Sequence, residues 1–574
     1  MIDQGQQDQL DRSVRLSESF DPALYNLILS ELTAGKVVTG TGGGLTMSTI
    51  STAAAVALPG AGRTVPTLSA YLANNAVLNL KDFGGVVDGA TDDTAALLAT
   101  VAAAPAGGST ILIPGFAKIS GTITINTPDV TVIGPGTSGG IIPANATFNP
   151  FTLGPLAHRC KFLNMWIKGA AVDATTIQFG IYTNALAAPD DVEIAGCFFG
   201  NPLIGGVNSL NSAIKIDGGN GWNVHHCKAK YLWGTISNTG YGILAGTTNK
   251  LHAHDNEFLG TTGRGRHAVY LSGGCTYCDV HDNHAENLAE DGFPIFSTSI
   301  QAAGIGNHVH NNVAINCGQL TAGSAAFSVS GNSSRNIIEN NLAVNFQGNG
   351  YIVAALGVAA ITDGNIFRNN WSYFSQWYGI LNEGAQNTDI FGNTFAESSR
   401  SGSNNYAAIA VRPSGAVPSS GVTVRDNKGT GVLLRAGMDL TGAVLATGLR
   451  VDNNYFPDGV TSKIDNPNNV LFSGQNNDFG LPSYSGNQGD VSVTLRVGRD
   501  AEVDLFASSL TANRTVTLDT VSAYSGAKFR IVRTGLGAFT LDVGGLKTIP
   551  ISTVAFVDVQ YESGAWKLSG YGTL

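Results

Sequence analysis

A six-residue segment recurs at a nearly constant interval through the middle of this 574-residue chain. We mark each copy by its last residue, and the ten markers are Cys197, Cys227, Asn256, Asn283, Asn312, Asn341, Asn370, Asn393, Asn427 and Asn454. Four of the nine intervals between markers are 29 residues, and the others run from 23 to 34. A steady period over this many copies predicts a solenoid, in which each repeat packs only against its neighbours.

The repeated segment has the pattern of a strand with one buried face. The residue three before each marker is apolar in all ten copies, whereas the residue two before is mostly polar. This alternation predicts a β-strand. We expect the asparagine markers to adopt the left-handed backbone of a sharp turn. We also expect their side-chain amides to form a ladder along the stacked coils.

A second apolar segment follows the marker in most periods, as in AIKI (213–216), GILA (242–245) and AVYL (268–271). No helical pattern separates the two segments of a period. Parallel strands without crossover helices favour a coiled parallel β-helix. The sequence therefore predicts an all-β fold.

The composition fits this fold and limits the partners. Glycine is 73 of 574 residues and charged residues are 13%, which is typical of short strands joined by tight turns. The net charge is −10, and no basic run marks a nucleic-acid-binding surface. No apolar run approaches the ~18 residues that a membrane-spanning helix needs. We expect neither nucleic acid nor a membrane span, whereas a sugar polymer stays open as a partner.

The six cysteines are too few for a disulfide scaffold in a chain of this length. Cys275 and Cys278 form one CxxC pair, but no second pair accompanies it to complete a structural zinc site. We expect the cysteines to be buried thiols.

Three aspartates lie close together in LKDFGGVVDGATDDTAALLA (80–99), at Asp88, Asp92 and Asp93. Grouped carboxylates are typical of metal sites and of proton transfer. This stretch, however, lies where the first coils begin, and the open end of a solenoid needs protection from pairing with other chains. We therefore interpret it as an end cap. A calcium site is the alternative, although the spacing of an EF-hand is absent.

The cap is predicted to contain a short helix over residues 91–104. Thr91 or Asp92 can cap its N-terminus, and Asp93 suits the helix dipole. The residues expected to face the core are Ala95, Leu98 and Val101.

The same stretch, followed by GGSTILIPG (107–115), resembles the start of the pectate-lyase-like β-helix superfamily. That start is common in phage tailspikes and capsular polysaccharide depolymerases, usually as FGAxGDGxxDDTxA. The matching residues are Phe83, Gly84, Asp88, Gly89, Asp92, Asp93, Thr94, Ala95, Pro114 and Gly115, whereas Gly85, Val86 and Val87 depart from the usual form. With the coils, the resemblance extends over residues 80–480. It implies a right-handed parallel β-helix, a single-stranded solenoid in which this segment is structural.

Three parts are predicted: an N-terminal helical attachment segment and linker (1–78), the β-helix with its capping helix (79–480), and a C-terminal β-sandwich (481–574). Short helices are predicted over 24–32 and 64–75, and a linker rich in Gly, Thr, Ala and Ser over 35–62. Alternating segments beyond residue 490 predict a sandwich of about eight strands. In tailspike-like proteins such C-terminal modules hold a trimer or bind sugar. In such proteins the N-terminal region often attaches to the particle, and because this one is short for a head-binding domain we expect an adaptor.

Turns of uneven length follow the markers, and in this superfamily such turns border grooves that bind extended polymers. Glycoside hydrolysis needs two carboxyl groups ~5–5.5 Å apart for retention or ~6.5–9.5 Å apart for inversion. Equivalent residues on adjacent coils are ~4.8 Å apart, which brings turn carboxylates within reach of one another. The candidate catalytic residues are Glu257, Glu286, Glu290 and Asp291, with Asp217 and Glu383 as weaker candidates. Solvated turn carboxylates without a catalytic role are the alternative.

Aromatic faces stack on sugar rings, and arginines bind hydroxyl and acidic groups. The candidate substrate-binding residues are Trp233, Tyr241, Arg264, Arg266, His267, Tyr270, Trp371, Trp377 and Tyr378. A lyase instead needs a cation to neutralise a uronate and a base to take its C5 proton. Arg264 or Arg266 with His267 or Tyr270 can supply these groups. An ordinary turn salt bridge is the alternative for either arginine.

Four histidines occupy the same place in consecutive repeats: His225, His254, His281 and His310. We expect them to form a column on an outer face, with a trimer interface as one role. Stacked imidazoles at this spacing can also hold a metal, which is the alternative. No cofactor is predicted.

Three functions fit this fold, because the scaffold hosts all of them. The first is a phage tailspike-type receptor-binding protein that depolymerises a bacterial capsule, exopolysaccharide or O-antigen by glycoside hydrolysis with paired carboxylates. The alternatives are a polysaccharide lyase and a non-catalytic sugar-binding adhesin. The resemblance implies a homotrimer in the virion tail, assembled in the host cytoplasm and acting at the bacterial surface.

Overall fold

The computed structural model describes residues 36–41, 44–49, 77–171, 177–183, 188–201, 209–234, 239–261, 264–320, 324–356, 360–399, 406–430, 436–440, 448–456, 462–465, 472–475, 487–497, 500–521 and 523–574. The chain divides into two compact units, Met1–Ala73 and Asn74–Leu574. Among the described residues, none of the helices has the length and apolar character to cross a membrane.

The first unit contains an antiparallel hairpin of β1 (Lys36–Thr41) and β2 (Gly44–Thr49). The linker prediction is wrong for these two segments, because their valine and threonine residues favour strands. The helices predicted over 24–32 and 64–75 lie outside the described residues.

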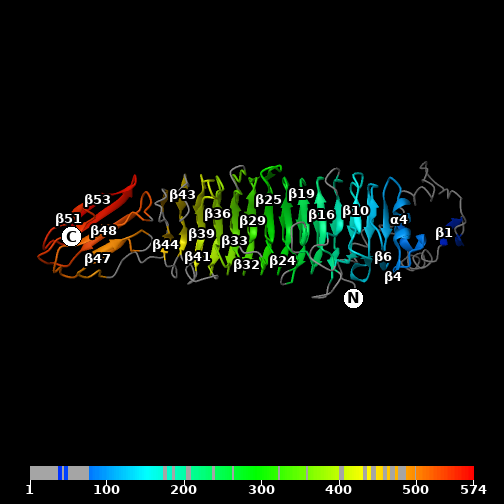
Figure 1. Cartoon of the computed structure of the whole chain (residues 1–574), viewed down its shortest axis with the longest axis horizontal. Helices are drawn as coiled ribbons and strands as arrows, with labels where there is room; N and C mark the ends of the chain where they lie inside the picture. Colours follow the sequence, from blue (N-terminus) through cyan, green and yellow to red (C-terminus); the bar gives the residue numbers. More distant parts are fainter. Residues whose placement is uncertain are drawn as a thin grey trace. The chain divides into compact units, whose positions relative to one another are not determined.

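The second unit contains a parallel β-helix, in which each coil contributes one strand to each of three sheets (Figure 1). This confirms the predicted fold. The sequence pattern indicated two strands in each period, but the structure has three. The additional strand begins directly after each marker from Cys197 to Asn427, where a turn was expected. It is only three residues long in most coils, too short to show a period of its own.

The first sheet contains the repeated segments that end at the markers. Its fifteen strands are β3 (Val77–Asn79), β5 (Ser109–Leu112), β8 (Val130–Ile133), β11 (Lys161–Leu163), β14 (Glu193–Ala195), β17 (Asn223–His225), β20 (His252–His254), β23 (Asp279–His281), β27 (His308–His310), β31 (Ile337–Glu339), β34 (Ile366–Arg368), β37 (Asp389–Phe391), β40 (Thr423–Arg425), β43 (Leu449–Asp452) and β45 (Phe472–Gln475). The middle residue of each strand from β14 to β40 is buried. These residues are the apolar ones three before the markers, as predicted.

The second sheet follows the markers. Its thirteen strands are β4 (Asp88–Asp92), β6 (Phe116–Ile119), β9 (Gly140–Pro143), β12 (Trp166–Ile167), β15 (Phe198–Gly200), β18 (Lys228–Lys230), β21 (Glu257–Leu259), β24 (His284–Glu286), β28 (Val313–Ile315), β32 (Leu342–Val344), β35 (Trp371–Tyr373), β38 (Thr394–Ala396) and β41 (Lys428–Thr430). Uneven connections lead from these strands to the third sheet.

The third sheet has the longest strands of the β-helix. They are β7 (Ile123–Ile125), β10 (Phe151–Leu153), β13 (Phe179–Thr183), β16 (Ser212–Asp217), β19 (Tyr241–Gly246), β22 (His267–Ser272), β25 (Phe293–Ser297), β29 (Ala325–Gly331), β33 (Asn349–Ala354), β36 (Ile380–Glu383), β39 (Ala407–Arg412), β42 (Ala436–Asp439) and β44 (Ser462–Asp465). They include the apolar second segments AIKI, GILA and AVYL noted in the sequence, which lie in β16, β19 and β22. A further small pair joins β26 (Gly304–Ile305) to β30 (Ser333–Ser334).

The asparagine markers form the predicted amide ladder. From Asn256 to Asn454, the side-chain Nδ2 of each marker donates to the Oδ1 of the next at 2.9–3.1 Å. Each Oδ1 also accepts the backbone N–H of the marker on the preceding coil. The ladder therefore satisfies polar groups that burial removes from water.

The backbone prediction for the markers is wrong. The left-handed residue is the one before each marker, as at His226, Asp255 and Asn311, with φ between 53° and 55°. That residue points out at the corner, so the marker itself can turn its amide inward. A second ladder, of Asn307, Asn336 and Asn365, lies at another corner, with Nδ2–Oδ1 distances of 2.9 and 3.0 Å. Its three residues were too few to stand out as a repeat.

The opening stretch forms an end cap whose aspartates bind separate partners. It comprises η1 (Leu80–Phe83), β4 and α4 (Thr94–Ala102). Asp92 accepts from the N–H of Thr94 at 3.0 Å and from the hydroxyl of Ser120 at 2.5 Å. The Ser120 and Thr94 bonds lower the pKa of Asp92 to about 2. The N-cap residue of α4 is Asp93 rather than the predicted Thr91 or Asp92, but Asp92 still accepts the first N–H of the helix.

Asp93 has a different role from the one predicted. Its buried carboxylate accepts the backbone N–H groups of Val86 and Val87 at 2.7 and 3.1 Å, so it fixes the preceding loop. The buried face of α4 also differs. Val101 is buried as expected, but Ala95 and Leu98 are exposed. The buried residues are Leu97, Thr100 and Val101.

The six cysteines are free and buried, as predicted. Burial raises the pKa of the Cys160 thiol to about 11 and that of Cys317 to about 12. Both therefore remain protonated at neutral pH, which suits a packing role.

Two four-stranded sheets follow the β-helix in sequence. Their strands are β46 (Val493–Leu495), β48 (Arg514–Leu518), β50 (Leu541–Val543) and β51 (Lys547–Ile549) in one, and β47 (Val503–Phe506), β49 (Lys528–Arg533), β52 (Ala555–Glu562) and β53 (Ala565–Thr573) in the other. They share an apolar core, and the eight strands match the predicted number. Pairing is mixed, since β46, β48 and β50 run parallel, as do β47 and β49. Only the last part of this domain is antiparallel like the expected sandwich.

Candidate functional site

A hollow of about 390 Å³ lies on the outward face of the third sheet, over β16, β19, β22 and β25. These four strands come from consecutive coils, and their registers place outward residues in rows across the sheet. The residues lining the hollow that carry ring or charged groups are Lys215, Asp217, Tyr241, Arg266, Tyr270 and Phe296. Three of them, Tyr241, Arg266 and Tyr270, are predicted substrate-binding residues.

Aromatic rings from successive coils stack along the hollow. The centroids of Tyr241 and Tyr270 are 5.6 Å apart with planes 22° apart, and Tyr270 lies 6.4 Å from Phe296. Tyr270 and Phe296 remain partly exposed, whereas Tyr241 is buried. Burial raises the pKa of Tyr270, so its hydroxyl stays protonated and can donate a hydrogen bond. Partly exposed rings with polar tips suit contact with sugars.

Two cations border the same rings. Arg266 donates from Nη1 to the Tyr241 hydroxyl at 2.9 Å and from Nε to Glu290 Oε2 at 2.7 Å. Lys215 Nζ lies 3.2 Å from Asp217 Oδ2. A side chain at position 246 would begin 2.8 Å from Asp217 Oδ1, so Gly246 leaves room for this carboxylate. Among the described residues, the lining contributes two cations and one carboxylate, and Glu290, which pairs with Arg266 at 2.7 Å, brings a second carboxylate to the same region.

Glu290 and Asp291 are adjacent in sequence but have opposite environments. Burial acts to raise the pKa of Glu290, yet His267 and Arg266 outweigh it and hold the pKa below its usual value. His267 Nε2 is 3.4 Å from Glu290, and its Nδ1 is 3.0 Å from the Asp291 carbonyl. Glu290 and the predicted His267 therefore lie behind Arg266 and hold it in place.

Asp291 is partly exposed, and desolvation of its carboxyl group raises its pKa. It accepts from the N–H of Ala325 at 2.7 Å and from the Ser328 hydroxyl at 3.0 Å, which ties two coils together. Both carboxyl oxygens are therefore bound by groups of the chain itself, so we do not propose Asp291 as a catalytic residue.

Glu257 and Glu286 lie on strands of the second sheet rather than in turns. Glu257 on β21 is 2.7 Å from Lys228 Nζ and 3.2 Å from Lys230 Nζ. Burial acts to raise its pKa, but the two lysines hold it below the usual value. Glu286 on β24 is level with Leu259 and lies 3.4 Å from His284. Both glutamates are therefore on another sheet from the hollow.

The second sheet has a smaller hollow near Glu257. It measures about 280 Å³, and Trp166, Phe198, Lys228 and Lys230 are among the residues lining it. Little polar surface faces this hollow, so it differs in character from the one on the third sheet.

The other predicted binding residues are dispersed. The Arg264 guanidinium lies 3.3 Å from the centroid of Trp233, in the connection before the third sheet. Trp371 is 40% exposed on β35 of the second sheet. Trp377 stacks on Tyr406 at 5.7 Å. Tyr378 is only 5% exposed, and its hydroxyl donates to Asp439 at 3.0 Å, so its ring is not available to a sugar.

Sequence reasoning did not select Lys215 or Phe296. Both occupy outward positions of the third sheet, one residue from a buried apolar neighbour. The period-two alternation of β16 and β25 was the available signal. Their closeness was hidden because it depends on connections of different length between β16 and β25.

Comparisons with known proteins bear on the fold. No protein-family model matches the chain, and no curated protein matches it in sequence. The Dettilon tailspike protein (gp208) is 16% identical, with 70% of each chain covered and a TM-score of 0.50. The A-module of the Azotobacter vinelandii mannuronan C-5 epimerase AlgE6 is 17% identical over 70% of this chain and 98% of that one, with a TM-score of 0.45. The alginate lyase AlyF-OU02 is 11% identical over 71% and 87%, with a TM-score of 0.41. The chain is a right-handed parallel β-helix protein, and it shares this fold with the tailspike.

Proposed function

We propose that this chain is a tailspike-type receptor-binding protein that binds and depolymerises an acidic polysaccharide of the bacterial surface. The observation that carries the proposal is the hollow on the third sheet. It combines rings stacked along successive coils with the cations Arg266 and Lys215. Because successive coils each contribute a ring or a cation to this face of the sheet, successive side chains can contact successive sugar units of an extended polymer. The likeness to a tailspike supports the fold on which this arrangement depends.

The sequence favours hydrolysis, but the hollow does not supply the pair of carboxyl groups that hydrolysis needs. Asp217 is level with Ser272, five residues along β22 from His267, which contacts Glu290. At ~3.3 Å per residue, Asp217 and Glu290 are roughly 16 Å apart along the strands. This exceeds the ~9.5 Å limit for an inverting pair.

Elimination is the cleavage that the hollow favours. A lyase needs a cation beside the uronate carboxylate, a base for the C5 proton and a proton for the leaving oxygen. We propose that Arg266 binds the carboxylate and that the protonated hydroxyl of Tyr270 donates to the leaving oxygen. Asp217 is as far along the strands from Arg266 as it is from Glu290, roughly 16 Å, so it cannot take the C5 proton of a uronate whose carboxylate Arg266 binds, and we assign no base.

Hydrolysis remains the second candidate, at a different place. Glu286 is level with a residue two positions from Glu257 on the adjacent strand. Their Cα atoms are therefore about 8 Å apart, which suits an inverting pair. This candidate would use the second sheet and its smaller hollow.

Product analysis separates the two candidates. The purified full-length chain is incubated with a panel of capsular and O-antigen polysaccharides, including uronate-containing ones. We expect reducing ends together with the ultraviolet absorbance of an unsaturated uronate, both lost in Tyr270→Phe. Saturated ends that persist in Tyr270→Phe and disappear in Glu257→Gln would instead assign hydrolysis to the second sheet. Binding of a polysaccharide without any cleavage product would instead support the non-catalytic sugar-binding adhesin.

The same proposal includes a homotrimer in the virion tail, with an adaptor at the N-terminal segment. It rests on the β-helix, the C-terminal sheets and the resemblance of the opening stretch. Light scattering that gives the mass of one chain at every dilution would contradict the trimer.

A further inference from the structure

The predicted histidine column is present on the outward face of the first sheet. His225, His254, His281 and His310 stack on β17, β20, β23 and β27, with successive ring centroids 4.8–5.0 Å apart and planes within 11°. Their side chains are 20–23% exposed, so solutes can reach them. This column lies on a different sheet from the hollow, and no step of the proposed function uses it.

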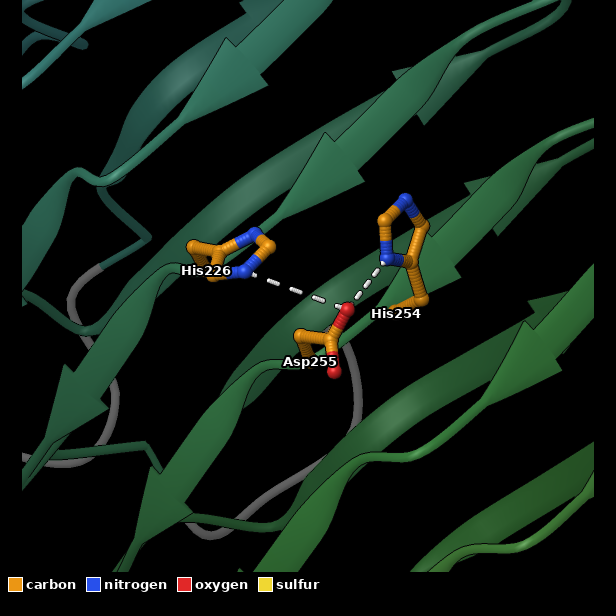
Figure 2. Close-up of side chains that lie close together, drawn as sticks. All are labelled: His226, His254 and Asp255. Carbon is orange, nitrogen blue, oxygen red and sulfur yellow. Dashed lines mark hydrogen bonds and ion pairs between the residues drawn. The ribbon is translucent and has the colours of Figure 1, made fainter. Parts of the chain in front are cut away.

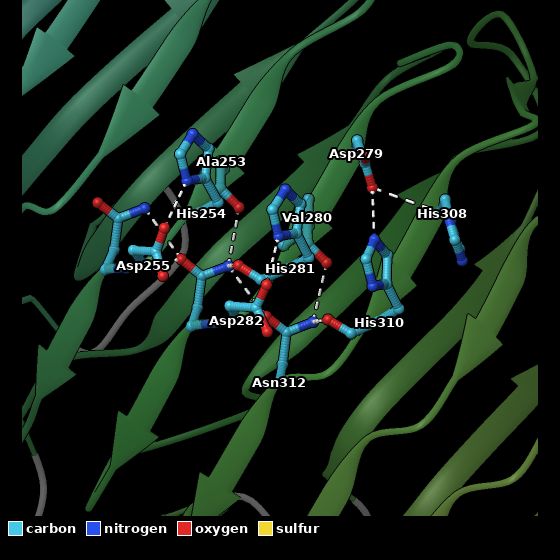
Figure 3. Close-up of polar contacts among 12 residues, drawn as sticks. Ala253, His254, Asp255, Asp279, Val280, His281, Asp282, His308, His310 and Asn312 are labelled. Atoms are coloured by element: carbon cyan, nitrogen blue, oxygen red, sulfur yellow. Dashed lines mark hydrogen bonds and ion pairs between the residues drawn. The ribbon is translucent and has the colours of Figure 1, made fainter.

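One end of the column contains a cluster of metal-binding side chains. Asp279, His281 and His310 each place one ligand atom within 4.8 Å of the other two. His310 Nε2 is 3.0 Å from Asp279 Oδ1, and His308 Nδ1 is 3.8 Å from the same oxygen. Figure 3 shows Asp279 above His310 and beside His308. Asp279 and His281 are on β23, and His308 and His310 are on the adjacent β27. Three imidazoles and one carboxylate thus surround one small region.

Two carboxylates hold the outer nitrogens of these imidazoles. Asp282 Oδ2 is 2.7 Å from His281 Nδ1, and Glu339 Oε1 is 2.7 Å from His308 Nε2. When His281 donates from Nδ1, its Nε2 keeps a lone pair. When His308 donates from Nε2, the lone pair remains on Nδ1, the atom that faces Asp279. Metal-binding histidines have this arrangement, because a carboxylate behind the ring fixes its tautomer and orientation.

We propose that Asp279, His281, His308 and His310 bind a divalent transition-metal ion, with zinc as the best match. Imidazole nitrogens with one carboxylate suit zinc, nickel or copper, whereas calcium and magnesium require mainly oxygen ligands. Ligand atoms around tetrahedral zinc lie about 3.4 Å apart, given bonds of ~2.0–2.2 Å. The side chains must therefore close by about 1 Å, which partly exposed rings can do by rotating about their side-chain bonds. The ion would join β23 to β27 and so link two coils.

A neighbouring cluster provides an internal comparison. His226, His254 and Asp255 also approach one another (Figure 2), with Asp255 Oδ2 2.7 Å from His254 Nδ1 and 4.0 Å from His226 Nε2. His226 is 65% exposed, and its Nδ1 faces His225 Nδ1 at 2.9 Å rather than a carboxylate. Because this cluster has two imidazoles rather than three, and His226 contacts another histidine rather than a carboxylate, we expect it to bind zinc less tightly than the first cluster.

Calorimetry of the full-length chain with zinc chloride tests the proposal. We expect one zinc ion per chain at the tightest site. Asp279→Asn and His310→Gln should each weaken it at least tenfold, and Asp282→Asn by 10- to 100-fold through loss of the outer carboxylate. Asp426→Asn is the matched control, since Asp426 also precedes a marker but lies beside Arg425. It should leave zinc affinity unchanged.

Two results would overturn the proposal. One is wild-type protein that takes up no zinc. The other is a tight site that survives Asp279→Asn and His310→Gln but is lost in His226→Gln, which would place the metal at the neighbouring cluster. The thermal unfolding midpoint of each metal-free variant shows that it is folded. A cobalt-loaded sample gives a second readout, because the visible spectrum of cobalt reports on its nitrogen ligands.

Discussion

Replacing Asn312 by alanine should lower the free energy of unfolding of the β-helix by about 3–5 kcal/mol. Asn312 is fully buried at the centre of the amide ladder. Its Oδ1 accepts from both the N–H and the Nδ2 of Asn283, at 3.0 and 2.9 Å. Its Nδ2 donates to the carbonyls of Val280 and His310 and to Asn341 Oδ1. Alanine leaves several of these buried groups unpaired, at a cost of ~1–3 kcal/mol each, reduced by relaxation.

Denaturant unfolding followed by circular dichroism measures this effect, with Asn332→Ala as its control. The Asn332 amide donates to the Gln301 carbonyl at 3.1 Å in an exposed position, where water replaces the lost bond. We expect the control to change stability by less than about 1 kcal/mol. Equal shifts in the two variants would show that the ladder contributes no more than a surface hydrogen bond.

Replacing Arg266 by glutamine should lower kcat/KM for the cognate polysaccharide by about 10- to 100-fold. A hydrogen bond to a charged partner contributes ~1.5–3 kcal/mol, and each 1.4 kcal/mol is a tenfold change. Arg425→Gln is the matched control. Arg425 also pairs with a carboxylate, Asp389 at 3.2 Å, and lies 3.9 Å from the ring of Phe391, but on the first sheet. Its loss should leave cleavage unchanged.

The removal of Arg266 also leaves Glu290 without its guanidinium partner, and this second effect needs its own variant. In Arg266→Gln/Glu290→Gln, the remaining side chains are neutral and can share a hydrogen bond. If Arg266 binds substrate, the double variant stays as slow as the single one. Recovery of wild-type kcat/KM in the double variant would contradict a role for Arg266 in substrate binding.

Much of the fold follows from the sequence because the coils repeat one short pattern. The apolar residues three before each marker, such as Val224 and Val309, stack in register as their alternation predicted. The amide ladder also follows, since identical amides in successive coils meet at the strand spacing. The sequence did not show which residue takes the left-handed corner, because both the markers and the residues before them, such as His226, Asp255 and Asn311, are mostly of types that tolerate this backbone. Only the structure shows that the residue before each marker takes this conformation while the marker itself turns its amide inward.

The site was less predictable, because it depends on contacts across coils rather than along the chain. Glu257 and Glu286 were expected in turns, since strands of three residues are too short to give a periodic signal. The hollow gathers Asp217, Tyr270 and Phe296 from three coils, and no sequence pattern links these positions. Arg266 was selected for its charge alone. Its place beside the rings is set by Tyr241 and Glu290, which contact it from other coils.

The most direct test of this account is a crystal structure of the full-length chain with an oligosaccharide of the polysaccharide that it cleaves. We predict that sugar rings lie along the third sheet over β16 to β25, against Tyr270 and Phe296, with an acidic group at Arg266. An oligosaccharide bound along the second sheet, beside Trp166 and Glu257, would contradict the central claim.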